Sequence, residues 1–132
     1  MTSPTPILNT SLPSTFRQIR IELAREKEHP EGAHNIAYVL VAPLDDDGHI
    51  DAETWRNHRE ACRVARLRPG EPIVHGHLVH RRGGSWAFEY DAGIPDEGGY
   101  HFNEERFVPG EYISVNEGGR MHPFRVVSAV RL

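Results

Sequence analysis

The sequence has a single cysteine, Cys62, so no disulfide can form within one chain, and a reducing cytoplasm is the expected compartment. It lacks an apolar run of the about 18 residues that a membrane-spanning helix needs, so no membrane protein is expected. The N-terminus has neither the basic start nor the apolar segment of a secretory signal. Positive charge is not in excess either, since the formal net charge is −4, which disfavours a general nucleic-acid-binding role.

The chain of 132 residues has the length of one ordinary domain. Its 38% hydrophobic and 26% charged residues are typical of a globular protein. Residues 1–14 are rich in proline, serine and threonine and offer little to bury, which predicts a flexible N-terminal arm. Residues 15–132 are expected to form a single β-rich globular domain.

Strand patterns occupy much of this domain. Residues 16–24 alternate between apolar and polar side chains, as a half-buried strand requires. Residues 36–42 are almost continuously apolar, which is typical of a strand covered on both faces. Residues 111–132 predict a hairpin that turns around Gly118 and Gly119.

One main helix is predicted over residues 51–66. Asp51 is a suitable N-cap, apolar residues recur with a helical period, and Pro69 and Gly70 stop the segment. Together with five or six strands, this helix predicts an α+β fold. We expect a small, mostly antiparallel twisted sheet or a partly closed β-barrel, with the helix covering one face.

Four arginines would share one side of this helix, within an arc of about 60° on a helical wheel. Such a row can bind phosphate or carboxylate groups, and it is a candidate site for an anion, an acidic protein partner or a second copy of the chain. The alternative is a solvent-exposed face that pairs with the acidic residues of this chain. The four residues are Arg56, Arg59, Arg63 and Arg66.

A second hairpin is predicted over residues 73–91, with a two-residue turn at Gly83 and Gly84. If Arg82 lies opposite Ser85, two histidines share a face with three aromatic rings. A mostly apolar pocket with a few polar groups is a candidate small-molecule site. Its predicted residues are His75, His77, Trp86, Phe88 and Tyr90.

The same two histidines are candidate metal ligands, because residues i and i+2 of a strand point the same way. His75 and His77 resemble the paired histidines of the cupin family, in which a glycine precedes the pair, as Gly70 does, and a proline-glycine segment opens a later strand, as Pro109 and Gly110 do. The resemblance implies an enzyme whose divalent transition metal activates water or dioxygen. The chain has arginines where cupins place a glutamate. A third ligand would come from His101, His122 or Glu89.

The aspartate-rich residues 44–51 do not fit a calcium loop. Aligning Gly48 with the invariant glycine of that loop puts Pro43 at the first ligand position and Thr54 where a bidentate glutamate belongs. We interpret this segment as a turn that leads into a helix cap. Cys62 is expected to be a small buried residue and not a nucleophile.

No complete catalytic set is present, and this favours a non-catalytic module that binds a small molecule or a protein partner. The first alternative is the metal-dependent, cupin-like enzyme. The second is a domain that assembles with itself through an exposed edge strand such as residues 125–132. The sequence does not decide whether the protein is an enzyme, but it favours a protein without catalytic activity.

Overall fold

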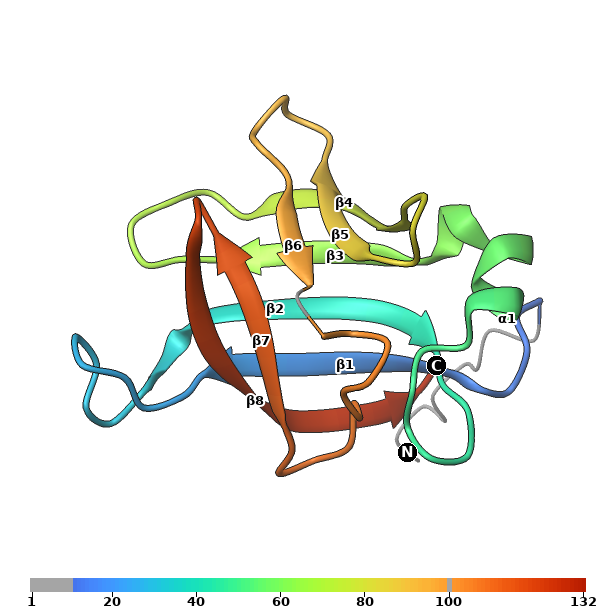
Figure 1. Ribbon diagram of the computed structural model, residues 1–132, viewed down its shortest axis with the longest axis horizontal. Helices are drawn as coiled ribbons and strands as arrows, with labels where there is room; N and C mark the ends of the chain where they lie inside the picture. The colour runs from blue at the N-terminus through green and yellow to red at the C-terminus, as the bar shows by residue number, and fades with distance from the viewer. Residues whose placement is uncertain (1–10, 100) are drawn as a thin grey trace, which may run out of the picture.

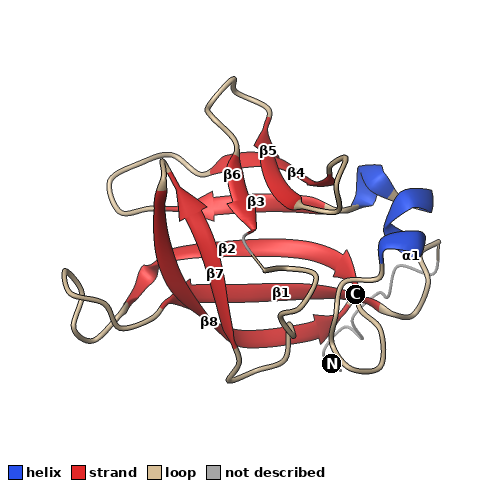
Figure 2. Cartoon of the chain, in the orientation of Figure 1, coloured by secondary structure: helices blue, strands red, loops and turns tan. Residues whose placement is uncertain are grey.

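The computed structural model describes residues 11–99 and 101–132. Within these residues, eight antiparallel strands form a closed barrel in which neighbours along the chain pair and the last strand pairs with the first (Figure 1). A short helix and a 3₁₀ turn connect the second and third strands at one end of the barrel (Figure 2). The elements are β1 (Phe16–Leu23), β2 (Ala33–Pro43), α1 (Ala52–Asn57), η1 (Arg59–Ala61), β3 (Arg63–Leu67), β4 (Val74–His80), β5 (Trp86–Tyr90), β6 (Glu97–Gly99), β7 (Tyr112–Glu117) and β8 (Arg120–Arg131).

The predicted flexible arm over residues 1–14 lies mostly outside the described residues. Of its described part, Leu12 packs against the core. None of the helices in the part of the chain that the structure describes has the length and apolar character of a transmembrane helix.

Inward-facing side chains fill the barrel. In β1, Ile19 and Ile21 are fully buried while Gln18 is exposed, so the predicted alternation is confirmed. The connection between β6 and β7 adds Phe102 and Phe107, and both are fully buried. Because eight strands enclose little more than the space that side chains occupy, this barrel has a packed core.

The strand predicted over residues 36–42 is confirmed as the centre of β2, with one difference. Tyr38 and Leu40 are buried in the barrel, whereas Val39 and Val41 are half-buried on the outer face. A barrel strand has one inner and one outer face, so the outer residues of β2 are only partly covered.

The predicted α+β fold with one main helix is wrong. The helix begins as expected, because the Asp51 side chain accepts hydrogen bonds from the backbone N–H groups of Glu53 and Thr54. It ends at Asn57, after six residues, and residues 63–67 form β3. The protein is therefore a nearly all-β barrel with more strands than expected.

Residues 61–66 fit the period of a helix, but the same residues also alternate as a strand does. Val64 and Arg66 point inward and are buried, while Arg63 points outward. This segment pairs with β2 on one side and β4 on the other, and these hydrogen bonds with two neighbouring strands outweigh its local helix propensity.

The C-terminal hairpin is confirmed. Glu117 pairs with Arg120, and Gly118 and Gly119 adopt positive φ of 61° and 86° in the two-residue turn. The edge strand predicted over residues 125–132 is wrong, because β8 pairs with β7 on one side and β1 on the other. Closure of the barrel leaves β8 without a free edge.

Gly76 is needed where β4 and β5 approach closely. A Cβ atom at Gly76 would overlap the carbonyl oxygen of Glu89 and lie 2.8 Å from Cα of Tyr90, and both are backbone atoms of β5. We expect Gly76→Ala to lower the free energy of unfolding by about 1–3 kcal/mol, measured by urea denaturation.

Gly98→Ala is the matched control. Its added Cβ would meet the Cβ of Asn116 at 3.8 Å, an ordinary contact, so the free energy of unfolding should change by less than about 0.5 kcal/mol. Equal losses in the two variants would contradict the close approach at Gly76.

Candidate functional site

The hairpin between β4 and β5 has a longer turn than predicted. The backbone N–H of Arg81 donates to the carbonyl oxygen of Ser85 at 2.8 Å, which leaves three residues in the loop. Gly83 and Gly84 take positive φ of 92° and 88°, as expected for turn glycines. The predicted strand register is therefore wrong by one residue, and such a slip moves each side chain to the opposite face.

This register does not assemble the predicted pocket. Trp86, Phe88 and Tyr90 point into the barrel and are buried, whereas His75 is exposed and His77 is half-buried on the outer face. The two histidines and the three rings lie on opposite sides of the sheet. Of the five residues, Tyr90 donates a hydrogen bond to the buried carboxylate of Glu97, and the ring of Phe88 packs against that of Tyr38.

Metal binding by His75 and His77 stays a prediction, now for two histidines on the outer surface. His77 lies near two carboxylates, with 3.7 Å between its Nδ1 and Oδ1 of Asp91 and 3.9 Å between its Nε2 and Oε2 of Glu60. Glu89 is directly opposite His77 in the sheet and shares this outer face.

The four arginines do not form one row. Arg56 is exposed on α1, and the guanidinium of Arg59 lies 4.9 Å from the ring centroid of Trp55. Arg63 points outward from β3, whereas Arg66 points inward and is only 7% exposed. The shared surface required a continuous helix, and the strand separates these side chains onto two faces.

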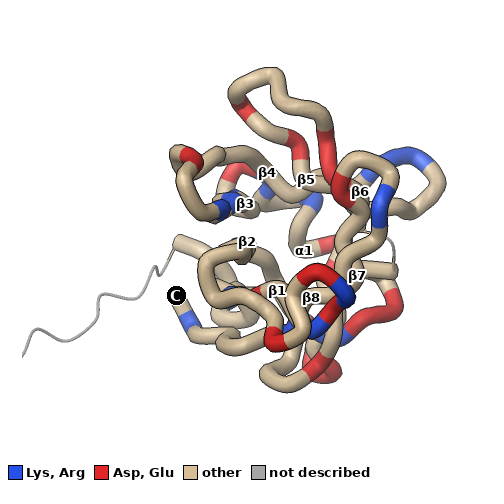
Figure 3. Tube along the Cα trace, turned by 90° about the vertical axis from the view of Figure 1, so that its left-hand side faces the viewer, with Lys and Arg blue, Asp and Glu red and all other residues tan. Residues whose placement is uncertain are grey.

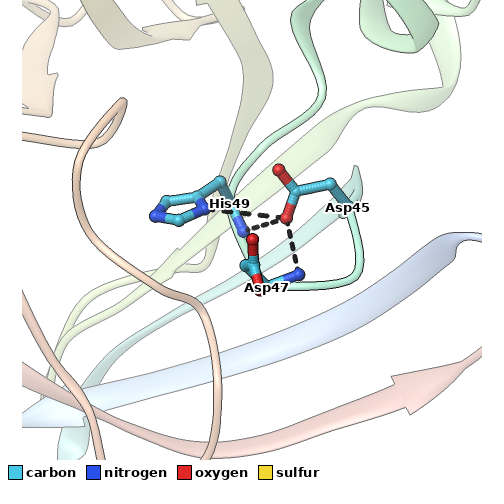
Figure 4. Close-up of side chains that lie close together, drawn as sticks. All are labelled: Asp45, Asp47 and His49. Carbon is cyan, nitrogen blue, oxygen red and sulfur yellow. Dashed lines mark hydrogen bonds and ion pairs between the residues drawn. The ribbon is translucent and has the colours of Figure 1, made fainter.

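Asp45, Asp47 and His49 come together in the loop that follows β2, with one potential ligand atom of each within 4.8 Å of the others (Figure 4). The Asp45 carboxylate already accepts hydrogen bonds from the backbone N–H groups of Asp47 and His49, both at 2.9 Å. Both aspartates are exposed. The contacts are those of an aspartate-stabilised turn, which agrees with our interpretation of this segment.

The buried charged residues gather at the other end of the barrel. Among the described residues, only Glu97 and Arg66 are both charged and buried, at 4% and 7% exposure. In Figure 1 this end is on the left, where the β1–β2 and β3–β4 loops and the β7–β8 turn lie, while α1 lies at the opposite end. Figure 3 views the barrel from this side, and both acidic and basic residues are present on its loops.

Glu97 is the innermost carboxylate and has the most partners. Its Oε1 accepts a hydrogen bond from the Tyr38 hydroxyl at 2.9 Å and a second one from the Tyr90 hydroxyl. Its Oε2 lies 2.9 Å from Nη2 of Arg68 and 3.5 Å from Nη1 of Arg66. Two tyrosines and two arginines therefore compensate this buried charge.

Glu117 connects this centre to the surface. Its Oε2 faces the same Tyr38 hydroxyl, whose single hydrogen Glu97 and Glu117 share, and lies 3.3 Å from Nη2 of Arg68. Its Oε1 lies 3.7 Å from Nε2 of His122, and Nδ1 of the same imidazole lies 2.8 Å from Oε2 of Glu26. We call this continuous set the mouth network; it comprises Glu26, Tyr38, Arg66, Arg68, Tyr90, Glu97, Glu117 and His122.

A pocket of about 280 Å³ opens beside the outer part of the network. Three connections frame it: the β1–β2 loop, the β3–β4 loop and the β7–β8 hairpin. Its wall contains both apolar and charged side chains. We call it the mouth pocket; its lining residues are Leu23, Glu26, Glu28, His29, Ile36, Arg68, Pro69, Glu71, Glu117 and His122.

Burial fixes the protonation of the two tyrosines. Burial, followed by the charge of Glu97, raises the pKa of Tyr38 far above its ordinary value, and burial and the hydrogen bond to Glu97 raise the pKa of Tyr90. Burial alone would lower the pKa of Arg68, but Glu117 and Glu97 outweigh it and raise that pKa. The hydroxyls therefore remain donors and the guanidinium remains charged.

Comparison with known proteins adds no relative: no protein-family model, curated protein or solved structure matches this chain.

Most of the mouth network was missed from the sequence. Arg66, Tyr90 and His122 were singled out, but for a helix face, a histidine pocket and a third metal ligand. A strand pattern over residues 62–68 would have shown that Arg66 and Arg68 lie on the same face as Val64. Nothing local marks Glu97, which the closure of the barrel brings close to Tyr38, a residue 59 positions earlier.

Tyr38→Phe tests the network. The change removes the hydroxyl shared by Glu97 and Glu117 and leaves two poorly solvated carboxylates with one donor fewer. We expect a loss of about 1–3 kcal/mol in the free energy of unfolding, measured by urea denaturation. Tyr112→Phe, at a residue that is 62% exposed, is the control and should leave stability unchanged. An unchanged free energy of unfolding in Tyr38→Phe would contradict the proposed hydrogen bonds.

Alkaline titration tests the raised tyrosine pKa values. In the unfolded chain tyrosine ionises near a pKa of about 10. A group whose folded pKa is raised contributes stability below that value and loses this contribution as the pH rises above it. Tyr38 and Tyr90 should therefore ionise only as the barrel unfolds, with tyrosinate absorbance and circular dichroism changing together. Ionisation of both residues within the folded barrel would contradict their burial.

Proposed function

We propose that the protein is a non-catalytic binding module and that a small molecule occupies the mouth pocket. The observation that carries this proposal is the position of the mouth network, a set of fixed donors and acceptors that ends at a pocket with apolar walls. Small-molecule sites typically combine such walls with a few polar groups held in place. Leu23 and Ile36 provide apolar surface, while Glu117 and His122 provide the polar groups.

The energetics of buried ion pairs support this proposal. Removing charges from water costs free energy that their mutual attraction often fails to recover, so apolar packing would serve the stability of the barrel as well or better. Glu97, Arg66 and the two tyrosines occupy inward positions that could hold apolar side chains. Ionisable groups that are buried beside a pocket are more often found at binding or catalytic sites than elsewhere.

The states of the ionisable side chains favour binding over catalysis. The raised pKa values of Tyr38 and Tyr90 keep both residues protonated, so neither is suited to act as a general base. Burial raises the pKa of Cys62 to about 12, which disfavours a thiolate nucleophile. The single cysteine continues to support a cytoplasmic location.

Two other proposals remain, each with less support. A metal-dependent enzyme would now use His75 and His77 on the outer surface, away from the mouth pocket. Self-assembly would need a face other than the edge of β8, because that strand is paired on both sides.

A pocket-filling substitution tests the binding function. Chemical shifts of ¹⁵N-labelled protein would be followed while fragments are added in equal shares of cationic, anionic and neutral compounds. We expect some fragments to shift amides around Leu23, Ile36 and Glu117. Ile36→Trp should abolish these shifts by filling the pocket, whatever the charge of the fragment.

Ile73→Trp is the control, because Ile73 is 53% exposed and does not line the mouth pocket. It should retain binding. The proposal is wrong if no fragment of any charge shifts these amides, or if both tryptophan variants bind as the parent protein does.

A further inference from the structure

We infer that the ligand of the mouth pocket is a small organic cation, namely a short aliphatic amine or guanidinium compound. The inference rests on the proposed function and names the chemical class of its ligand.

Negative charge is in excess around the pocket. Four glutamates line it, and of the described lining residues only Arg68 is an arginine or lysine. Arg68 is not free to attract an anion, because its Nη2 already lies 2.9 Å from Oε2 of Glu97 and 3.3 Å from Oε2 of Glu117. Of the other lining glutamates, Glu71 lies 3.9 Å from Arg66 and Glu28 lies 3.6 Å from Arg120. An anionic ligand would therefore meet four glutamates, and the arginines near them are each already paired with a carboxylate.

Glu26 is the carboxylate with the weakest compensation. Its side chain is only 17% exposed, and its described ion-pair partners are both histidines: His122 at 2.8 Å and His29 at 3.6 Å. Neither arginine nor lysine pairs with it among the described residues, so near neutral pH it has no permanently charged partner. A partly desolvated carboxylate in this situation is stabilised by an added cation.

His122 cannot satisfy both of its neighbouring carboxylates when neutral. Its two ring nitrogens face Glu26 and Glu117, and a neutral imidazole carries one N–H, so one carboxylate receives no hydrogen from it. A ligand ammonium or guanidinium can donate to the carboxylate that is left.

The volume and walls of the pocket limit the rest of the ligand. About 280 Å³ is just below the range of about 300–1,000 Å³ that is typical of ligand pockets, so the ligand is small. Leu23, Ile36 and Pro69 provide an apolar wall for a short methylene chain. A cationic group on a short aliphatic chain therefore matches both the glutamates and the apolar wall of the mouth pocket.

Isothermal titration calorimetry with three compounds of equal chain length tests the charge preference. The probes are putrescine as the diamine, succinate as the dicarboxylate and butanediol as the uncharged analogue. We expect saturable binding of putrescine alone. Glu26→Gln and Glu117→Gln should each weaken it about tenfold or more, because each removes a charge-assisted hydrogen bond. Glu89→Gln, which changes an exposed glutamate of β5, should bind putrescine as the parent protein does.

The outcomes separate this inference from the proposed function. Binding of succinate or butanediol but not putrescine, abolished by Ile36→Trp, would overturn the cation preference and leave a binding module. Putrescine binding that survives both glutamine substitutions would also overturn it. If none of the three probes binds, the cation preference is wrong, and the fragment experiment alone then decides whether the pocket binds a small molecule.

Discussion

The pairing of β8 with β1 is the constraint on which the rest of this structure depends. It closes the sheet, gives each strand two neighbours and divides all strand side chains into inner and outer sets. Aromatic and aliphatic residues fill the inner set along most of its length. Inward polar groups can remain in contact with water only near an open end of such a barrel. The mouth network lies at the end opposite α1 for this reason, and its outer members face the mouth pocket.

Features set by a few neighbouring residues could be predicted from the sequence. The alternation in β1, the apolar centre of β2, the Asp51 cap and the turn at Gly118 and Gly119 depend on local sterics and on period-two burial. The helix over residues 51–66 could not be predicted correctly because two periods fit the same residues. Only the pairing of β3 with β2 and β4 distinguishes them, and no pattern within residues 51–66 shows that pairing.

The predicted pocket of two histidines and three aromatic rings was wrong because the predicted register between β4 and β5 was shifted by one residue. Either a two-residue or a three-residue loop fits the sequence around Gly83 and Gly84, since glycine accepts positive φ in both. The barrel selects the longer loop, which turns Trp86, Phe88 and Tyr90 inward and the histidine pair outward. Burial of three large rings outweighs burial of two imidazoles, because apolar area removed from water is the main favourable term. The sequence-based choice of turn did not weigh this difference.

Charge compensation falls from the inside of the mouth network to its surface. Glu97 has two arginines and two tyrosyl hydroxyls, Glu117 shares one of each and adds a histidine, and Glu26 has histidines alone. The carboxylate of Glu97 is therefore held in one position by two arginines that carry a permanent positive charge. The carboxylate of Glu26 has only histidine partners among the described residues, and it lines the mouth pocket. A ligand cation would therefore act at the surface end of the network, where it meets a carboxylate that the protein itself leaves incompletely neutralised.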